Sequence, residues 1–182
     1  MTLKPLQFST LHERHIGVSE RVAQNYFEAA CVCLDRHHAS PIQFLITDND
    51  KHDNTQAEWI ATDARTRSAW ANKDDATRDG AYAVSLAAVE ITRGLVAVSR
   101  AETRTGADYY LGEPGTTPDD LEASYRLEVS GTDAGNETVI TARLRQKLDQ
   151  ASKGTSNLPA IASVVGFGAL QIVSADLTTE QS

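Results

Sequence analysis

The fold of this chain is decided by two stretches, ThrGlyAlaAspTyrTyr at 105–110 and TyrArgLeuGluValSerGly at 125–131. Both have the aromatic and apolar residues that favour strands, and each carries one acid, Asp108 in the first and Glu128 in the second. If the two strands are neighbours in one sheet, their carboxylates come together. Oxygen ligands of this kind hold Mg²⁺ or Mn²⁺, and such a metal can activate water against a phosphodiester.

The segments around these stretches change between helical and extended patterns. Residues 63–94 predict one long helix or two in succession, with the polar patch at 73–80 as a break and Gly94 as the terminator. An amphipathic helix is predicted at 137–153. Extended segments are predicted at 95–99, 107–111, 124–130 and 160–173, the last as one strand or as two with a bend at Gly166–Gly168. The order predicts an α+β fold with a mixed central sheet flanked by helices.

The N-terminal third has a different pattern. Residues 1–18 predict an arm that is ordered by contact with the body or with a partner, followed by a helix at 19–37 with Ser19 as its N-cap. A strand is predicted at 42–47, a polar loop at 48–55 and a returning strand at 58–61. We therefore expect an N-terminal arm and helix–hairpin unit at 1–62, a core at 63–176 and a disordered tail at 177–182.

Composition and charge narrow the function classes. The formal net charge of −8 counts against a dedicated non-specific nucleic-acid binder, which usually has a basic face. It is compatible with a metal-dependent nuclease, because bound cations offset local carboxylates. The sequence has no phosphate loop of the Walker type, no dinucleotide fingerprint and no Ser-His-Asp signature. We read no signal peptide and no apolar run of membrane-spanning length, and expect a cytoplasmic protein without membrane contact.

The order of elements and the two acids resemble the PD-(D/E)XK nuclease-like superfamily over residues 79–173. In that family an Asp lies on the second strand and a Glu on the third, in a Glu-X-Lys motif, which corresponds here to Asp108 and Glu128. Some branches add an acid from the first helix, and Glu90 matches it. The lysine position is occupied by Ser130, whose neutral hydroxyl cannot supply the charge of an ammonium.

The resemblance implies a restriction-endonuclease-like core and a site for one divalent cation. Asp108, Glu128 and the Val129 carbonyl would hold Mg²⁺ or Mn²⁺, and Glu90 would contribute directly or through water. A basic residue of the helix at 137–153 would replace the missing lysine. The basic candidates are Lys147, Arg143 and Arg145, with Lys147 in the catalytic role and Arg143, Arg145 and Ser130 as substrate-phosphate contacts. Gln146 and Gln150 of the same helix are weaker candidates for substrate contact.

Structural explanations stand beside these functional ones. Asp108 and Glu128 could pair with Arg100 and Arg126 in ordinary ion pairs. Glu90 lies late in a nearly apolar helix, where an unpaired carboxylate is costly, so pairing with Arg93 or Arg100 is the alternative to metal binding. A zinc site is disfavoured for the set formed by Cys31, Cys33, His37 and His38, because the two thiols of a Cys-X-Cys on a helix point to different faces.

Three functional hypotheses follow. The first is a metal-dependent phosphodiesterase of nuclease-like fold that acts on DNA. The second is a catalytically inactive protein of the same fold, an adaptor or assembly subunit that binds a protein partner or forms a homo-oligomer through its N-terminal unit. The third is an unrelated α+β binding module, in which case the strands that carry Asp108 and Glu128 need not be neighbours.

Overall fold

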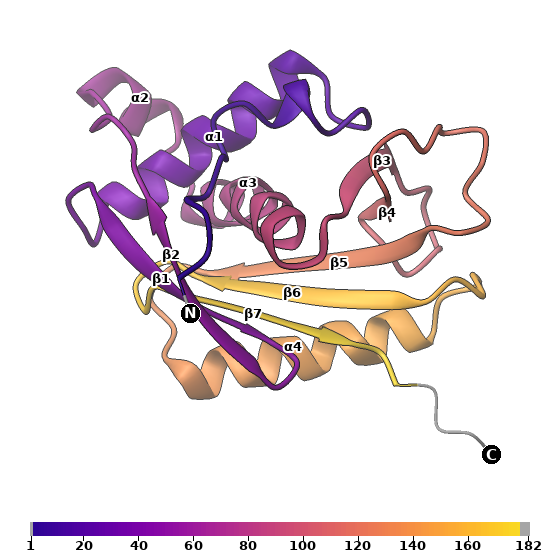
Figure 1. Cartoon of the computed structure of the whole chain (residues 1–182). Helices are drawn as coiled ribbons and strands as arrows, with labels where there is room; N and C mark the ends of the chain where they lie inside the picture. Colours follow the sequence, from indigo (N-terminus) through magenta and orange to yellow (C-terminus); the bar gives the residue numbers. More distant parts are fainter. Residues whose placement is uncertain (1, 179–182) are drawn as a thin grey trace.

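The computed structural model describes residues 2–178, which form a seven-stranded mixed sheet in the order β2-β1-β7-β6-β5-β4-β3 (Figure 1). Neighbouring strands are antiparallel except for the parallel pairs β1–β7 and β5–β6. The strands are β1 (Ile42–Asp48), β2 (Lys51–Ala57), β3 (Val96–Arg100), β4 (Tyr109–Gly112), β5 (Tyr125–Thr132), β6 (Ala160–Gly166) and β7 (Gln171–Asp176). The predicted α+β class with a mixed central sheet is confirmed.

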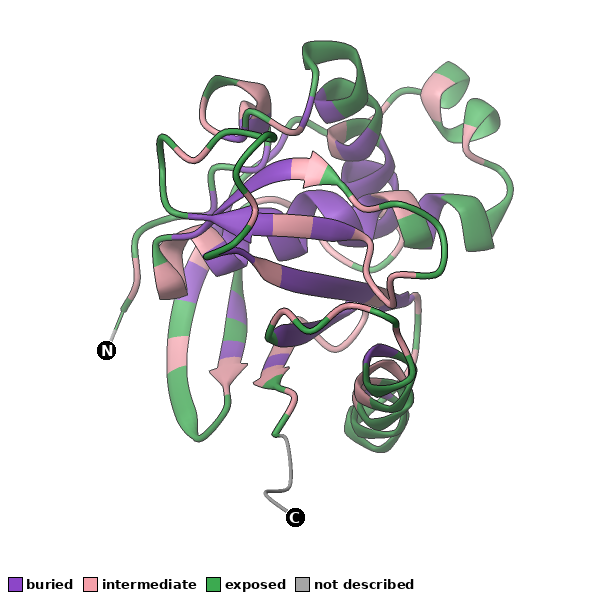
Figure 2. Ribbon diagram, turned by 90° about the vertical axis from the view of Figure 1, so that its right-hand side faces the viewer, coloured by how far each residue is buried: buried purple, intermediate pink, exposed green. Residues whose placement is uncertain are grey.

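Helices cover both faces of the sheet. Helices α1 and α3 lie on one side and α4 on the other (Figure 1). A short 3₁₀ turn, η1 (Leu11–Glu13), precedes them, and the helices are α1 (Glu20–Asp35), α2 (Ala64–Ala69), α3 (Lys73–Arg93) and α4 (Glu137–Ser152). Helix α3 is buried along most of its length, whereas the outer face of α4 is exposed (Figure 2). The part of the sheet that carries the two predicted acids therefore lies between a buried helix and an exposed one.

Local sequence determines where the helices begin and end. Ser19 caps α1 by accepting a hydrogen bond from the Val22 N–H, as predicted, and Gly94 ends α3 in the left-handed region at a φ of 68°. The break before α3 lies just before Asn72 and not within the polar patch at 73–80. Asn72 caps α3, and acids in the first helical turn interact favourably with the helix dipole, so the patch begins the helix instead of interrupting it.

The hairpin of the N-terminal third differs from the prediction. The polar residues 51–57, predicted to be mostly loop, form strand β2, and the returning strand predicted at 58–61 is absent from the described structure. Strand β2 is an edge strand whose ladder to β1 is made by backbone groups, so an apolar face is not required. The arm covers the outer edge of β2, because Leu3 and Leu6 donate backbone hydrogen bonds to its carbonyl groups.

The N-terminal residues share one hydrophobic core with the rest of the chain. Leu6, Phe8 and Leu11 are buried in the same cluster as residues of α3 and β5, and β1 pairs with β7. The unit predicted at 1–62 thus contributes two strands to the common sheet. Of the tail predicted at 177–182, residues 179–182 lie outside the described residues. Within 2–178, every helix is too short or too polar to cross a bilayer.

Candidate functional site

The pairing of β4 with β5 brings the two predicted acids together. Tyr109 pairs with Leu127, and the N–H of Asp108, the residue before β4, donates to the Leu127 carbonyl at 2.7 Å. Asp108 Oδ2 in turn accepts a hydrogen bond from the Val129 N–H at 2.8 Å, so the Asp108 carboxylate lies against β5 next to Glu128. Both acids line the same hollow. The adjacency on which the nuclease-like hypothesis depends is therefore present.

Asp108 is held through both of its carboxylate oxygens. Its Oδ1 accepts a hydrogen bond from the Tyr82 hydroxyl of α3 at 2.9 Å, and its Oδ2 accepts one from the Val129 N–H at 2.8 Å. The Arg100 Nη2 lies 3.7 Å from Oδ1. The Asp108 side chain remains 19% exposed, so the carboxylate is oriented by the protein and still reachable from solvent.

Glu128 is almost enclosed, with a side chain that is 3% exposed. Burial raises the pKa of its carboxyl, and so does the neighbouring Asp108, while Lys147 acts in the opposite direction. Two carboxyl groups close enough for this interaction favour a shared proton or a bound cation.

Lys147 of α4 places a positive charge beside Glu128. Its Nζ lies 3.1 Å from Glu128 Oε2 and 3.2 Å from Gln150 Oε1, so two acceptors hold the ammonium beside the acids. Arg143 is one turn earlier on the same helix face, and its Nη1 donates to the Ser130 hydroxyl at 3.5 Å. The structure thus gathers the predicted residues Asp108, Glu128 and Lys147, with Ser130 and Arg143 next to them.

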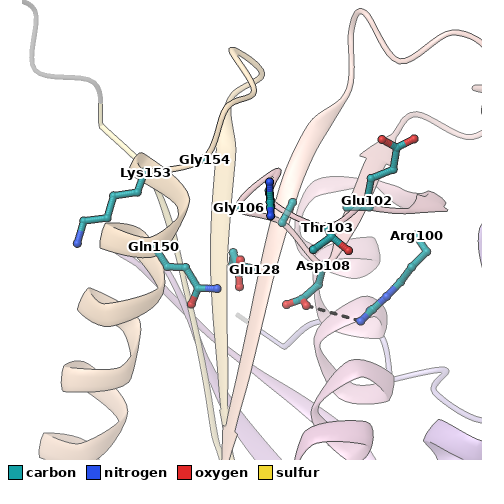
Figure 3. A pocket seen from close by; sticks show the side chains of 12 residues that line it. Arg100, Glu102, Thr103, Gly106, Asp108, Glu128, Gln150, Lys153 and Gly154 are labelled. Atoms are coloured by element: carbon teal, nitrogen blue, oxygen red, sulfur yellow. Dashed lines mark ion pairs between the residues drawn. The ribbon is translucent and has the colours of Figure 1, made fainter.

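Two hollows open beside this group. One, of about 550 Å³, is lined by Asp108, Glu128, Gln150 and Arg100 among others. In Figure 3, Gln150 reaches toward it from α4 and Arg100 from β3, with both acids between them. The second, of about 620 Å³, contains Ser130 and the cations Lys73, Arg78, Arg143 and Lys147. The acids therefore line the first hollow, whose walls carry both charges, while the second hollow has more cations than acids.

Two predicted site residues are not brought to this place. Glu90 makes hydrogen bonds with Arg14 Nε at 2.6 Å and His15 Nε2 at 3.0 Å, which tie the arm to α3. Its predicted alternative partners, Arg93 and Arg100, do not contact it in the described structure: Arg93 pairs with acids at positions 48 and 176. Arg145 is exposed and lines neither hollow. It is two positions from Lys147, and residues two apart on a helix lie on different faces.

The competing explanations are resolved in part by the contacts. Arg126 does not pair with Glu128; its guanidinium donates to the backbone carbonyls of Leu158, Thr105 and Ala151. Cys31 and Cys33 are free and buried in the core, as the structural explanation predicted. No group of three or more metal-ligating His, Cys, Asp or Glu side chains occurs within residues 2–178. Asp108 and Glu128 are thus a two-carboxylate site.

Sequence reasoning missed Tyr82 as a site residue and treated Arg100 only as an ion-pair partner. Tyr82 bonds to Asp108 from within α3, and Arg100 lines the hollow next to it. Tyr82 lies in a nearly apolar stretch, where a tyrosine hydroxyl needs a polar partner once it is buried. That requirement was the available signal, but the identity of the partner depends on how α3 packs against β4.

Comparison of the chain with protein-family models, with curated proteins and with solved structures found no match.

Proposed function

We propose that this protein is a metal-dependent phosphodiesterase of nuclease-like fold that acts on DNA. The observation that carries the proposal is the contact of Lys147 Nζ with Glu128 Oε2 at 3.1 Å, next to Asp108. It supplies, from α4, the ammonium that the Glu-X-Lys motif of PD-(D/E)XK nucleases places two residues after the glutamate. The run of helix, three antiparallel strands, helix and parallel strand from α3 to β6 also agrees with that resemblance.

The two acids are suited to a hard divalent cation, Mg²⁺ or Mn²⁺. Both present oxygen. Burial and then the charge of Asp108 raise the pKa of Glu128, and a bound cation would offset the repulsion between the two carboxylates. Mg²⁺ usually keeps several waters and takes one or two carboxylates from a protein, so two acids are enough. When bound, the cation lowers the pKa of a water ligand and polarises the scissile phosphate.

The residues of this chain would then divide the remaining tasks. Asp108, fixed by hydrogen bonds to both oxygens, orients the cation. Lys147 is held by Glu128 and Gln150 beside the acids, where its charge offsets the charge that develops on the phosphate. Arg143 and Ser130 border the adjoining cationic hollow and can contact the next phosphate of the strand.

The test is a nicking assay on supercoiled plasmid and on single-stranded DNA with Mg²⁺, with Mn²⁺ and with chelator. We expect Asp108→Asn, Glu128→Gln and Lys147→Met each to reduce the rate by about 100-fold or more, the scale of losing one transition-state charge contact. Asp120→Asn is the matched control, because this acid is exposed in a loop and lines none of the hollows near β4 and β5. If the three site variants nick DNA as fast as the wild type, the proposal is wrong.

A second candidate function is an adaptor without catalysis, and two observations favour it. Glu128 is already neutralised by Lys147 in a nearly closed position. The N-terminal third also exposes four large apolar side chains, among them Ile16 at 64% and Ile60 at 90%, which suit contact with a protein partner or a second copy. Titration of Mn²⁺ by calorimetry separates the two functions: binding that Glu128→Ala abolishes supports the phosphodiesterase, and an absence of binding at millimolar metal supports the adaptor.

A further inference from the structure

The guanidinium of Arg100, the last residue of β3, is fixed beside the acids by aromatic rings. Its central carbon lies 4.6 Å from the centroid of the Tyr82 ring and 4.8 Å from that of the Tyr109 ring. Its Nη2 donates to the Tyr82 hydroxyl at 3.0 Å. The Arg100 side chain is nevertheless 50% exposed, and it lines the same hollow as Asp108 and Glu128. Arg100 is therefore a restrained cation with an open side.

Tyr82 links Arg100 to Asp108. The residue is 6% exposed, and its hydroxyl contacts the guanidinium on one side and Asp108 Oδ1, at 2.9 Å, on the other. Guanidinium only donates and carboxylate only accepts, so the hydroxyl must accept from Arg100 and donate to Asp108. Burial, and then the charge of Asp108, raise the pKa of Tyr82, which keeps the proton on the hydroxyl.

The contact of Arg100 with Asp108 is not a hydrogen bond. The separation of 3.7 Å exceeds hydrogen-bond length, and a guanidinium carries five N–H donors, of which the contact with Tyr82 uses one. A planar guanidinium at the edge of a hollow is the group that binds a phosphate through two parallel hydrogen bonds. Figure 3 shows Arg100 facing the acids from β3, whereas Lys147 contacts Glu128 from α4.

We propose that Arg100 contacts the substrate phosphate in this hollow, on the β3 side of the acids, and that Tyr82 is the positioning residue that orients Asp108. This inference rests on the proposed phosphodiesterase function. It adds a second cation to the site, so that a phosphodiester beside the two acids would meet positive charge from two elements, β3 and α4.

Variants that differ by single groups test the two roles, which the Mn²⁺ affinity tells apart. Tyr82→Phe removes the hydroxyl that bonds to both Asp108 and Arg100 and keeps the ring under Arg100. Tyr26→Phe is its matched control, because the Tyr26 hydroxyl bonds to the Tyr109 hydroxyl at 2.7 Å in the same cluster and does not contact Asp108 in the described structure. Arg100→Gln removes the charge, and Arg100→Lys restores the charge without the planar fork.

The measurements are kcat and KM for plasmid nicking and the Mn²⁺ dissociation constant from calorimetry. We expect Arg100→Gln to lower kcat/KM by about 100-fold while the Mn²⁺ affinity changes less than about threefold, since Arg100 binds phosphate and not metal. Arg100→Lys should recover less than about a tenth of the loss. Tyr82→Phe should weaken Mn²⁺ binding and lower kcat by about tenfold each, the scale of one hydrogen bond to a charged group, with KM unchanged. Tyr26→Phe should leave all three quantities within about twofold.

The outcomes distinguish a failure of this inference from a failure of the proposed phosphodiesterase function. If the wild type nicks DNA and Asp108→Asn does not, but Arg100→Gln and Tyr82→Phe behave as the wild type, the inference is overturned and the proposed function stands. If Tyr26→Phe loses as much as Tyr82→Phe, the Tyr82 hydroxyl has only a structural role and the positioning claim fails. A wild-type protein that neither nicks DNA nor binds Mn²⁺ overturns both.

Discussion

Lys147→Met should destabilise the protein in a way that depends on pH, whatever the function of the protein. The substitution removes the ammonium that lies 3.1 Å from Glu128 Oε2 and leaves a carboxylate that is 3% exposed beside Asp108. Removing one partner of a fully buried ion pair costs roughly 3–5 kcal/mol. Because the Lys147 side chain is 21% exposed, solvent screens part of the interaction, and we expect a loss of about 2 kcal/mol at pH 8.

The loss should shrink in acid. The pKa of Glu128 is raised in the folded protein, and removing Lys147 takes away an influence that lowers it, so the variant's Glu128 has a still higher pKa. A carboxyl whose pKa is raised by folding costs stability above that pKa, and the cost disappears as the pH falls through it toward the value of the unfolded chain. The difference between variant and wild type should therefore be smaller at pH 5 than at pH 8.

Urea denaturation at the two pH values measures these quantities. With an m-value of about 2 kcal/mol per molar urea, a loss of about 2 kcal/mol lowers the midpoint by about 1 M. The same substitution in a Glu128→Gln background should cost less than about 0.5 kcal/mol, because no buried charge is left unpaired. Arg145→Met, two residues away and exposed, is the control and should change stability by less than about 0.5 kcal/mol. Equal costs of Lys147→Met in the Glu128 and Glu128→Gln backgrounds would refute the reasoning.

Three further substitutions probe what holds the site in place. Arg126→Met should cost about 2–4 kcal/mol in urea denaturation, because a buried guanidinium that satisfies three backbone carbonyls leaves them unpaired; a variant as stable as the wild type contradicts this. His15→Ala should cost about 2–3 kcal/mol and speed amide exchange in the N-terminal arm, since the fully buried ring accepts from the Ala97 N–H and bonds to Glu90; unchanged exchange contradicts it. Gly80→Ala should lower the melting temperature despite the better helix propensity of alanine, because the new Cβ would lie 2.9 Å from α1 backbone; an increase in melting temperature contradicts it.

The sequence predicted the elements of the core because their local signals agree. The cap at Ser19, the terminator at Gly94 and the strand-favouring residues around Asp108 and Glu128 each act through a few neighbouring residues. It failed at strand β2, residues 51–57, since an edge strand can be built from polar residues by backbone pairing alone. It also misplaced the break before α3, because the acids that looked like a loop suit the first turn of a helix.

For the candidate site, the sequence by itself determined the chemistry that is present: two strand-borne acids, a serine where the resembled motif has lysine, and basic residues on the following helix. Only the tertiary structure decided which of these meet. The pairing of β4 with β5 put Asp108 next to Glu128, and the packing of α4 brought in Lys147 and left Arg145 outside. Arg14 and His15 of the N-terminal arm bind Glu90 away from the site. The physical reason is range: caps and strand patterns act within a few residues, whereas a hydrogen bond between Tyr82 and Asp108, or between His15 and Glu90, depends on how distant elements pack.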